Sequence, residues 1–452
     1  MTNLYSLMVV QDHIWDTIKS AIAKAQNAGE LPTCDLPTKS LEHPQNPNHG
    51  DYSSNIALRL SKQMKINPMQ IAELIEAHID VNSPIESISV ANPGFLNFNL
   101  ESTWVKNQVD EIIEMGDKYG NIQLGNATKI QIEFVSVNPT GPLHIGHARG
   151  AVVGSALSNI LNAADYKVEN EYYVNDAGAQ VDNFAESIYA QYKKDKGIDV
   201  NIPEDGYKGD YINEIASDIS SCTNLNIDDM SEEHALQSIK EYGLKLMLRA
   251  IRQDLDSLRV HMDEWFSEKS LYQDGTYKTI KQELNKNDLL EIKDGALWFK
   301  SSELGDDKDN VVEKSNGRPT YFASDIAYHY NKFTLRNFEF VVNIWGSDHQ
   351  GHIPRLKTVV NALKIDSSRL KFILTQMVKL KRGSSAVKMS KRSGELITLA
   401  EFIKEVGADA CRFFFLSRSP DSQLDFDIEL AQKQSSENPV YYIQYGLSLI
   451  HI

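Results

Sequence analysis

The sequence has little cysteine and no long apolar run. Its three cysteines, Cys34, Cys222 and Cys411, stand about 190 residues apart, which fits neither a disulfide framework nor a zinc site. No segment approaches the roughly 18 consecutive apolar residues of a membrane span. The N-terminus also lacks the basic residues that open a secretory signal. We therefore expect a cytoplasmic protein that has no membrane contact and no structural zinc.

The sequence also has fewer basic than acidic residues. The chain has 46 Lys and Arg against 62 Asp and Glu, so its formal net charge is −16 at pH 7. This balance argues against indiscriminate binding to nucleic acid, although a local basic surface can exist within an acidic whole. With 41% hydrophobic and 24% charged residues, the composition excludes a disordered, collagen-like or coiled-coil chain. At about 150 residues per domain, the 452 residues predict about three domains.

The first hundred residues have the pattern of a small α+β domain. Apolar residues at helical spacing predict three helices, and alternation followed by a turn predicts two paired strands. In chain order these five segments are residues 4–26, 52–64, 72–78, 85–94 and 95–100. A turn-rich break separates the first helix from the second.

The strongest chemical signal is a predicted strand, turn and helix between residues 128 and 161. Apolar residues alternate along the strand and place Glu133 on the opposite face. His144 and His147 lie at the turn where the helix begins, and unpaired N–H groups and the helix dipole favour phosphate there. Gly146 has no side chain, so a flat ring or a phosphate can approach the backbone closely.

The histidine pair alone leaves three interpretations open. The two rings could bind a metal, could simply begin a helix, or could contact phosphates and a transition state. A metal site would need a third ligand nearby, and none has the usual spacing. The position between a strand and a helix favours phosphate contacts.

A basic segment, residues 371–394, reverses the sign of the charge. It holds seven Lys or Arg and no Asp or Glu. Near its end, small residues surround Lys388 and Lys391, which is the composition of a mobile loop. Ammonium groups on such a loop can close over a triphosphate and stabilise a departing pyrophosphate. For this segment alone, a solvated basic loop is the alternative.

Taken together, His144-Ile-Gly-His147 and Lys388-Met-Ser-Lys391 resemble the two signature motifs of class I aminoacyl-tRNA synthetases. The resemblance implies an α/β fold in which a Rossmann-type parallel sheet is split by an insertion and its halves meet over ATP. Further segments resemble the arginyl-tRNA synthetases along most of the chain. They are residues 50–55, 92–98, 133–150, 173–180, 318–328, 346–352 and 407–414.

This resemblance implies ligation of L-arginine to tRNA(Arg) in two steps. The arginine carboxylate attacks the α-phosphorus of ATP and releases pyrophosphate, and arginine then moves to the 3′-terminal adenosine. Mg²⁺ accompanies ATP with few dedicated protein ligands, and members of this family typically need bound tRNA before the adenylate forms. The alternatives are another nucleotidyltransferase with a His-x-Gly-His motif and a non-catalytic RNA-binding relative.

The resemblance also assigns residues to roles. It implies that His144, His147, Lys388 and Lys391 are catalytic. The other implied nucleotide contacts are Gly146, Met377, Val378, Asp348 and His349. The implied arginine contacts are Glu133, Asn138, Tyr321 and Asp325. Independently of the resemblance, a guanidinium is a planar fork of five donors that keeps its charge, so a selective pocket must supply carboxylates such as Glu133 and Asp325. Taken alone, Asp325 would more often be a helix-surface carboxylate or a cap, and Glu133 a solvated strand residue.

The expected organisation follows the same resemblance. Residues 1–115 form an additional domain that touches the tRNA elbow, and residues 116–395 form the catalytic domain with an insertion at about 180–315. A helical stem at 396–436 leads into a truncated anticodon-binding helical domain at 437–452. We expect a monomeric enzyme and interpret the chain as a fragment, because the resemblance implies a further helical domain beginning near Asn438 and the chain stops at Ile452. Residues 447–452 match a translated sequencing adapter; an apolar helical continuation is the alternative.

Overall fold

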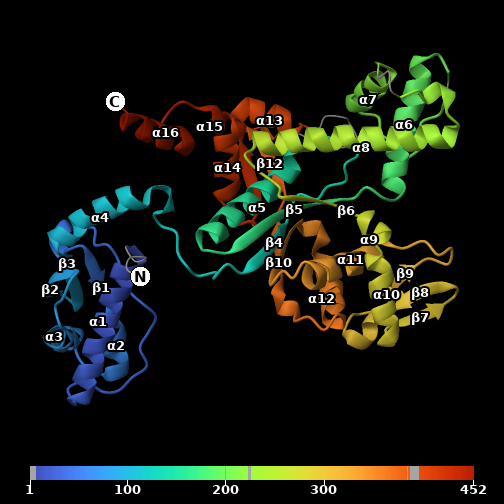
Figure 1. Cartoon of the computed structure of the whole chain (residues 1–452). Coiled ribbons are helices and arrows are strands. Elements are labelled where there is room, and N and C mark those ends of the chain that lie inside the picture. The colour runs from blue at the N-terminus through green and yellow to red at the C-terminus, as the bar shows by residue number, and fades with distance from the viewer. Residues whose placement is uncertain (1–6, 199, 222–224, 384, 387–396, 452) are drawn as a thin grey trace. The chain divides into compact units, whose positions relative to one another are not determined.

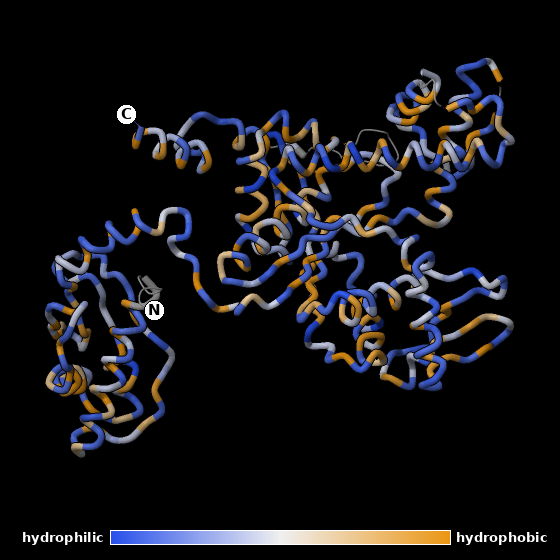
Figure 2. The backbone as a smooth tube through the Cα atoms, viewed as in Figure 1, coloured by the Kyte–Doolittle hydropathy of each residue, from blue (hydrophilic) through white to orange (hydrophobic). Residues whose placement is uncertain are grey.

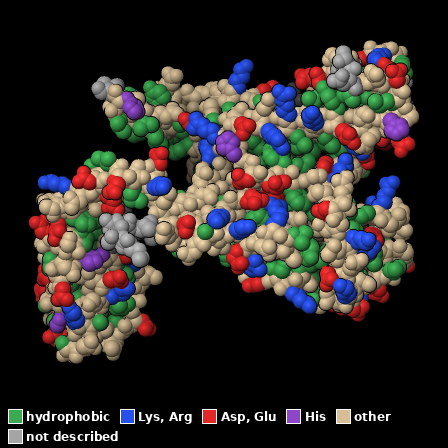
Figure 3. Space-filling model, in the orientation of Figure 1, with side chains coloured by type: hydrophobic (Ala, Val, Ile, Leu, Met, Phe, Trp, Pro, Cys, Tyr) green, Lys and Arg blue, Asp and Glu red, His purple; other side chains and the backbone are tan. Residues whose placement is uncertain are grey.

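The computed structural model describes residues 7–198, 200–221, 225–383, 385–386 and 397–451. The chain divides into two compact units, Met1–Leu124 and Gly125–Ile452 (Figure 1). Hydrophobic residues occur along both units (Figure 2). On the face shown in Figure 3, acidic and basic side chains are interspersed. In the described part of the chain, no helix is long and apolar enough to cross a bilayer.

The first unit is the predicted α+β domain. Its antiparallel sheet has the order β1-β3-β2, and the buried residues of α1, including Ile14 and Ile18, share one core with Phe98 of β3. Residues 52–54 form a strand that pairs with β3, so the prediction of a helix from residue 52 was wrong there. The elements are α1 (Leu7–Asn27), β1 (Tyr52–Ser54), α2 (Ile56–Met64), α3 (Pro68–Ala77), β2 (Ile85–Ala91), β3 (Phe95–Leu100) and α4 (Ser102–Met115).

A five-stranded parallel sheet organises the second unit and confirms the predicted fold class. Its order is β11-β10-β4-β5-β6, and every neighbouring pair is parallel. The strands are β4 (Lys129–Glu133), β5 (Lys167–Val174), β6 (Glu264–Ser267), β10 (Phe340–Gly346) and β11 (Leu370–Thr375). The carboxyl ends of parallel strands meet at one edge of a sheet, where ligands bind in open α/β folds.

The helix after β4 packs tightly against the sheet. This helix, α5, spans Ile145–Ala163, so it begins within the predicted turn and includes His147. A Cβ added at Gly154 would lie 2.4 Å from the ring of Phe134, which is too close for any side chain. Glycine there permits the close helix-to-strand packing of the core.

The segment between β5 and β10 is not one uninterrupted insertion. Helices α6 (Ala179–Asp195), α7 (Asp210–Ser221) and α8 (Glu232–Ser257) come first, and β6 then returns to the main sheet beside β5, where Tyr172 pairs with Trp265. The second part is a three-stranded antiparallel sheet, of order β7-β8-β9, with short helices. Its elements are α9 (Ser270–Gln273), α10 (Thr276–Lys286), β7 (Leu290–Lys293), β8 (Ala296–Phe299) and β9 (Asn310–Glu313).

Two helices and a π-helical turn complete the second half-sheet: α11 (Tyr321–Tyr330), η5 (Asn331–Leu335) and α12 (Ile353–Ala362). The stem that follows is not purely helical, because β14 pairs in parallel with β12. The C-terminal elements are β12 (Val378–Arg382), β13 (Ser385–Ala386), α13 (Leu399–Val406), α14 (Ala408–Leu416), β14 (Leu424–Asp427), α15 (Ile428–Gln432) and α16 (Pro439–Leu449). Lys388 and Lys391 lie outside the described residues.

Candidate active site

The two histidines form a capping box at the start of α5. His144 is the N-cap, and its Nδ1 accepts a hydrogen bond from the N–H of Gly146 at 3.1 Å. Nδ1 of His147 accepts from the N–H of His144 at 3.3 Å, and the ring centroids are 3.6 Å apart. A nitrogen that accepts carries no proton, so each neutral ring carries its proton on Nε2. Each Nε2–H is therefore a donor.

Gly146 is required by this arrangement. A Cβ at that position would lie 2.8 Å from Cε1 of His144. The two histidines can therefore begin the helix and also contact phosphate, because Nδ1 of each ring is used in the cap and the proton on Nε2 is a separate donor. As for the metal interpretation, no group of three His, Cys, Asp or Glu suited to a metal occurs among the residues with described positions.

The residues expected on the nucleotide side come from two neighbouring segments. Asp348 and His349 are exposed in the 3-10 turn η6 (Ser347–His352), directly after β10. Met377, with 74% of its surface exposed, and Val378, which is buried, lie where β12 begins. The Ser347 hydroxyl donates to Oε1 of Gln376 at 3.3 Å and connects the two segments.

The predicted arginine contacts Asp325 and Tyr321 lie one helical turn apart on α11. The Asp325 side chain is 36% exposed, and one of its oxygens lies 3.7 Å from Nη2 of Arg355. Burial raises the pKa of Asp325 to about 7; the nearby Glu133 and Glu268 also raise it, and Arg355 opposes them. Tyr321 is exposed, and its hydroxyl lies near Gly178.

Asn138 is held by two other amide side chains. Its Oδ1 accepts from Nδ2 of Asn175 at 2.7 Å, and its own Nδ2 donates to Oε1 of Gln180. Asn175 follows β5 and Gln180 begins α6, so the segment after β5 fixes the orientation of the Asn138 amide.

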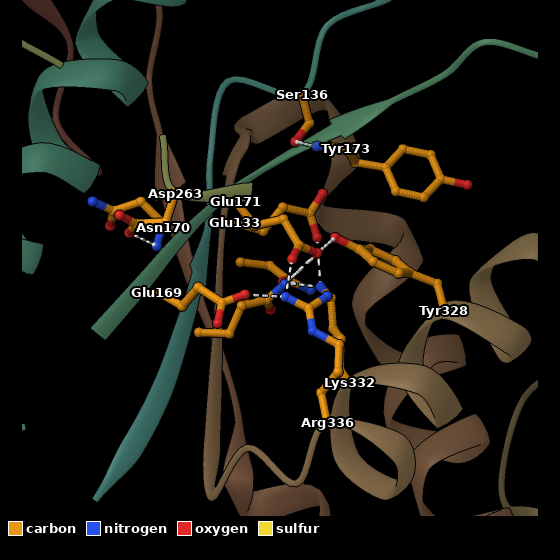
Figure 4. A network of polar contacts seen from close by, with 12 residues as sticks. Glu133, Ser136, Glu169, Asn170, Glu171, Tyr173, Asp263, Tyr328, Lys332 and Arg336 are labelled. Atoms are coloured by element: carbon orange, nitrogen blue, oxygen red, sulfur yellow. Dashed lines mark hydrogen bonds and ion pairs between the residues drawn. The ribbon is translucent and has the colours of Figure 1, made fainter. Parts of the chain in front are cut away.

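Glu133 has a partner inside the protein. Its Oε2 lies 2.6 Å from Nζ of Lys332, an ammonium group that is fully buried (Figure 4). The same Nζ donates to Oδ1 of Asn343 at 3.2 Å and lies 3.9 Å from the ring centroid of Tyr328. Glu133 is therefore not a solvated strand residue. No local sequence pattern indicates Lys332, because the contact joins residues 199 positions apart.

Beneath this pair, a polar network joins β4, β5 and the end of η5. Glu171 is fully buried and accepts hydrogen bonds from Tyr328, Arg336 and Gln131 (Figure 4). Burial raises the pKa of Glu171, and the Arg336 hydrogen bond opposes the rise most strongly. Arg336 also pairs with Glu169. Most of these groups bind one another, while Oε1 of Gln131 and Nη1 of Arg336 are buried without a hydrogen-bond partner among the described residues. We assign the network to the support of the pocket.

A third carboxylate, Glu268, was missed at the sequence level. It follows β6 and is buried; its Oε1 accepts from the Ser324 hydroxyl at 2.5 Å. Its Oε2 is buried without a hydrogen-bond partner among the described residues. Burial raises the pKa of Tyr173, and the charges of Glu268, Asp325 and Glu133 raise it further. The charges of three carboxylates thus act on Tyr173. If β6 had been predicted as a strand of the parallel sheet, Glu268 would have been placed at the carboxyl edge of that sheet.

Two families match this chain. The family described as arginyl tRNA synthetase N-terminal domain matches residues 12–100. The catalytic domain of class I tRNA synthetases, in its arginine-specific form, matches residues 108–414. The fold and the site therefore define a class I aminoacyl-tRNA synthetase.

Whole-chain relatives give the specific family. The arginine–tRNA ligase of Dehalococcoides mccartyi strain CBDB1 is 48% identical over 451 residues, which cover 99% of this chain and 81% of the relative. That of Carboxydothermus hydrogenoformans is 44% identical over 443 residues, covering 98% and 79% of the two chains. The chain belongs to the arginyl-tRNA synthetase family, and it ligates arginine to tRNA with ATP.

Solved structures agree in fold. A structure from Campylobacter jejuni is 36% identical, with a TM-score of 0.71 over 78% of this chain and 76% of that one. The arginyl-tRNA synthetase of Thermus thermophilus is 18% identical, with a TM-score of 0.64 over 95% and 80% of the two chains, and it supports the fold alone.

Proposed function

We propose that the guanidinium of arginine binds among Asp325, Glu268 and Glu133, beside Tyr173. The observation that carries this proposal is the unpaired, buried Oε2 of Glu268, next to a half-open Asp325. The three carboxylates have two cations nearby, Lys332 against Glu133 and Arg355 at 3.7 Å from Asp325, so a further cation would balance the pocket. A planar fork of donors can use several carboxylate oxygens at once.

The other end of arginine would then lie near Asn138. Asn138 binds the α-amino or the α-carboxylate group, with its amide oriented by Asn175 and Gln180. Tyr321, exposed one turn before Asp325, holds the guanidinium together with Asp325 and Glu133.

ATP would bind at the start of α5. His144 and His147 donate to phosphate oxygens through Nε2–H, and Gly146 underlies the adenosine. The backbone of Met377 and Val378 reads adenine, and the pair Asp348 and His349 lies on the nucleotide side. Lys388 and Lys391, outside the described residues, stabilise the departing pyrophosphate. Mg²⁺ accompanies ATP and is held mainly by phosphate oxygens.

The chain's own residues position the reactants and stabilise charge. The arginine carboxylate attacks the α-phosphorus in line, so no protein nucleophile is required. The two neutral imidazole donors stabilise charge that develops on the phosphates. A hydroxyl of the 3′-terminal adenosine of tRNA(Arg) then attacks the carbonyl carbon of the arginyl adenylate, the acyl–phosphate bond breaks, and AMP leaves.

The remaining roles complete the proposal. Residues 1–115 contact the tRNA elbow, and the segment from residue 437 begins a domain that contacts the anticodon stem-loop. The enzyme acts as a cytoplasmic monomer. These roles rest on the resemblance of the sequence and on the match of residues 12–100 to the N-terminal domain family.

The test is Glu268→Gln in arginine-dependent ATP–pyrophosphate exchange, run with and without tRNA(Arg). We expect the KM for arginine to rise about 10-fold or more, while the KM for ATP stays within about twofold. Glu313→Gln is the matched control, because Glu313 is a half-buried carboxylate that binds Lys281 and Tyr277 in the small β-sheet. An unchanged KM for arginine in Glu268→Gln would exclude Glu268 from the pocket.

A further inference from the structure

Arg149 connects α5 to two distant segments of the chain. It lies shortly after the histidine pair and is 1% exposed. Its Nη1 donates to the carbonyl oxygens of Gln376 at 3.1 Å and Ser422 at 2.6 Å. Its Nη2 donates to those of Ser419 at 2.8 Å and Arg418 at 3.4 Å. One planar group thus binds four backbone carbonyls.

Such a buried guanidinium is costly. Burial lowers the pKa of Arg149, and the charge of Asp421 opposes the shift. An arginine keeps its charge in proteins, so the fold bears a desolvation penalty that an apolar side chain would avoid. In return, the guanidinium satisfies carbonyls that apolar packing would leave without partners, and it fixes their positions relative to α5.

The segments held by Arg149 lead directly to the proposed adenine site. Gln376 precedes Met377 and Val378, and its N–H donates to the carbonyl of Pro420 at 2.9 Å. From Val378 onward, β12 runs in parallel with β14, starting opposite Leu424. The backbone at residues 376–378 is therefore fixed both to the turn before β14 and, through Arg149, to the helix that carries the histidines.

We propose that Arg149 is a positioning residue that sets the distance between the phosphate-contacting histidines and the adenine-reading backbone of residues 377 and 378. This inference rests on the proposed function, because it takes the adenine site to be at Met377 and Val378. In this proposal Arg149 contacts neither ATP nor arginine. It fixes the register in which the base and the phosphates of one ATP molecule are bound at the same time.

The test compares ATP with inosine triphosphate, whose base carries a carbonyl in place of the 6-amino group. Arg149→Lys keeps the charge but offers a point donor that cannot span both carbonyl pairs. We expect the ratio of kcat/KM for ATP to kcat/KM for inosine triphosphate to fall about 10-fold or more, with the KM for arginine within about twofold. A general loss of stability would lower both kcat/KM values together and leave the ratio unchanged.

Arg412→Lys is the matched control. Arg412 is also a partly buried guanidinium that donates to the Ser155 hydroxyl at 3.2 Å and to the carbonyls of Leu258 and Arg259. These contacts do not involve residues 376–378, so the nucleotide preference should match that of the wild type.

The possible outcomes distinguish the proposed adenine site from the proposed positioning role of Arg149. A wild-type enzyme that does not discriminate between the nucleotides would overturn the adenine site and this inference with it. A wild type that discriminates, with an Arg149→Lys variant that discriminates equally, would overturn the positioning role alone. Arg149→Gln, which keeps an uncharged amide donor, is the second variant if Arg149→Lys does not fold. Failure of both variants to fold would assign Arg149 to stability only and would also overturn the proposal.

Discussion

A buried carboxylate needs a proton or a cation to compensate it, and the pocket around Tyr173 uses both. Lys332 compensates Glu133 permanently, because this ammonium is fully buried against it. Asp325 and Glu268 have raised pKa values, which burial causes first. These two residues are therefore the ones whose charge a bound guanidinium would stabilise.

Asp325→Asn tests this division, because it keeps the shape of the side chain and removes its charge. We expect arginine affinity to fall about 10-fold or more while ATP affinity stays within about twofold, measured by calorimetric titration of each ligand alone. Asp309→Asn is the control, since Asp309 binds Lys293 in the small β-sheet. Unchanged arginine affinity in Asp325→Asn would place Asp325 outside the pocket.

The raised pKa of Asp325 gives arginine binding and stability opposite pH dependences. Since the carboxyl is protonated below about pH 7, arginine affinity should rise with pH up to that value and then level off. The folded pKa exceeds the unfolded value near 3.8, so the contribution of Asp325 to stability is present at low pH and is lost as pH rises through about 7.

Asp325→Asn should reduce both trends. The measurement is arginine titration together with thermal unfolding at several pH values between 5 and 8, for the wild type and the variant. Identical pH profiles in the two proteins would contradict the assignment of this pKa to Asp325.

At the scale of elements, the histidines in the first turn of α5 have two roles, one in capping the helix and one in the proposed contact with phosphate. The Nδ1 atoms of its histidines accept the hydrogen bonds of the capping box, which leaves the proton of each neutral ring on Nε2. Loss of such a cap typically costs about 1 kcal/mol. The contribution to catalysis and the contribution to stability can therefore be separated by choosing which ring nitrogen to replace.

His144→Asn should preserve the cap, because Asn is a strong N-cap residue, and should remove the distal donor. We expect an unchanged melting temperature and a fall of about 10²-fold or more in the rate of pyrophosphate exchange. His144→Gln places its amide nitrogen where Nε2 was and loses the cap, so it should melt earlier and keep more activity than His144→Asn. The reverse order of activities would contradict the proposed role of Nε2.

Some of these helices and strands could be predicted from the sequence, and others could not. The helix after the histidines and strand β4 follow from local periodicity, because both extend over several residues that alternate or recur regularly. Strand β6 has only four residues, and its place in the sheet depends on β5, some ninety residues earlier. Lys332 could not be assigned either, since its partner Glu133 lies on another element. Glu268 was missed for the same reason. Pairings between distant segments leave no local pattern.

At the scale of the whole molecule, the two units have separate hydrophobic cores. The core of the first unit draws its buried residues from Val10 to Leu100, and the main core of the second begins at Ile130. Each core is therefore complete within its own unit, which is the condition for independent folding.

Removing residues 1–124 should consequently leave a folded protein that binds arginine and ATP with affinities within about twofold of the full chain. Its affinity for tRNA(Arg) should fall about 10-fold or more, because the proposed contacts to the tRNA elbow are lost. Phosphate contacts release counterions, so the slope of log Kd against log salt should also become shallower. The measurement is equilibrium titration of tRNA at several salt concentrations, with arginine binding as the control for folding. Equal tRNA affinities and equal slopes in the two proteins would show that the first unit does not contact tRNA. A loss of arginine binding would show instead that the second unit needs the first in order to fold.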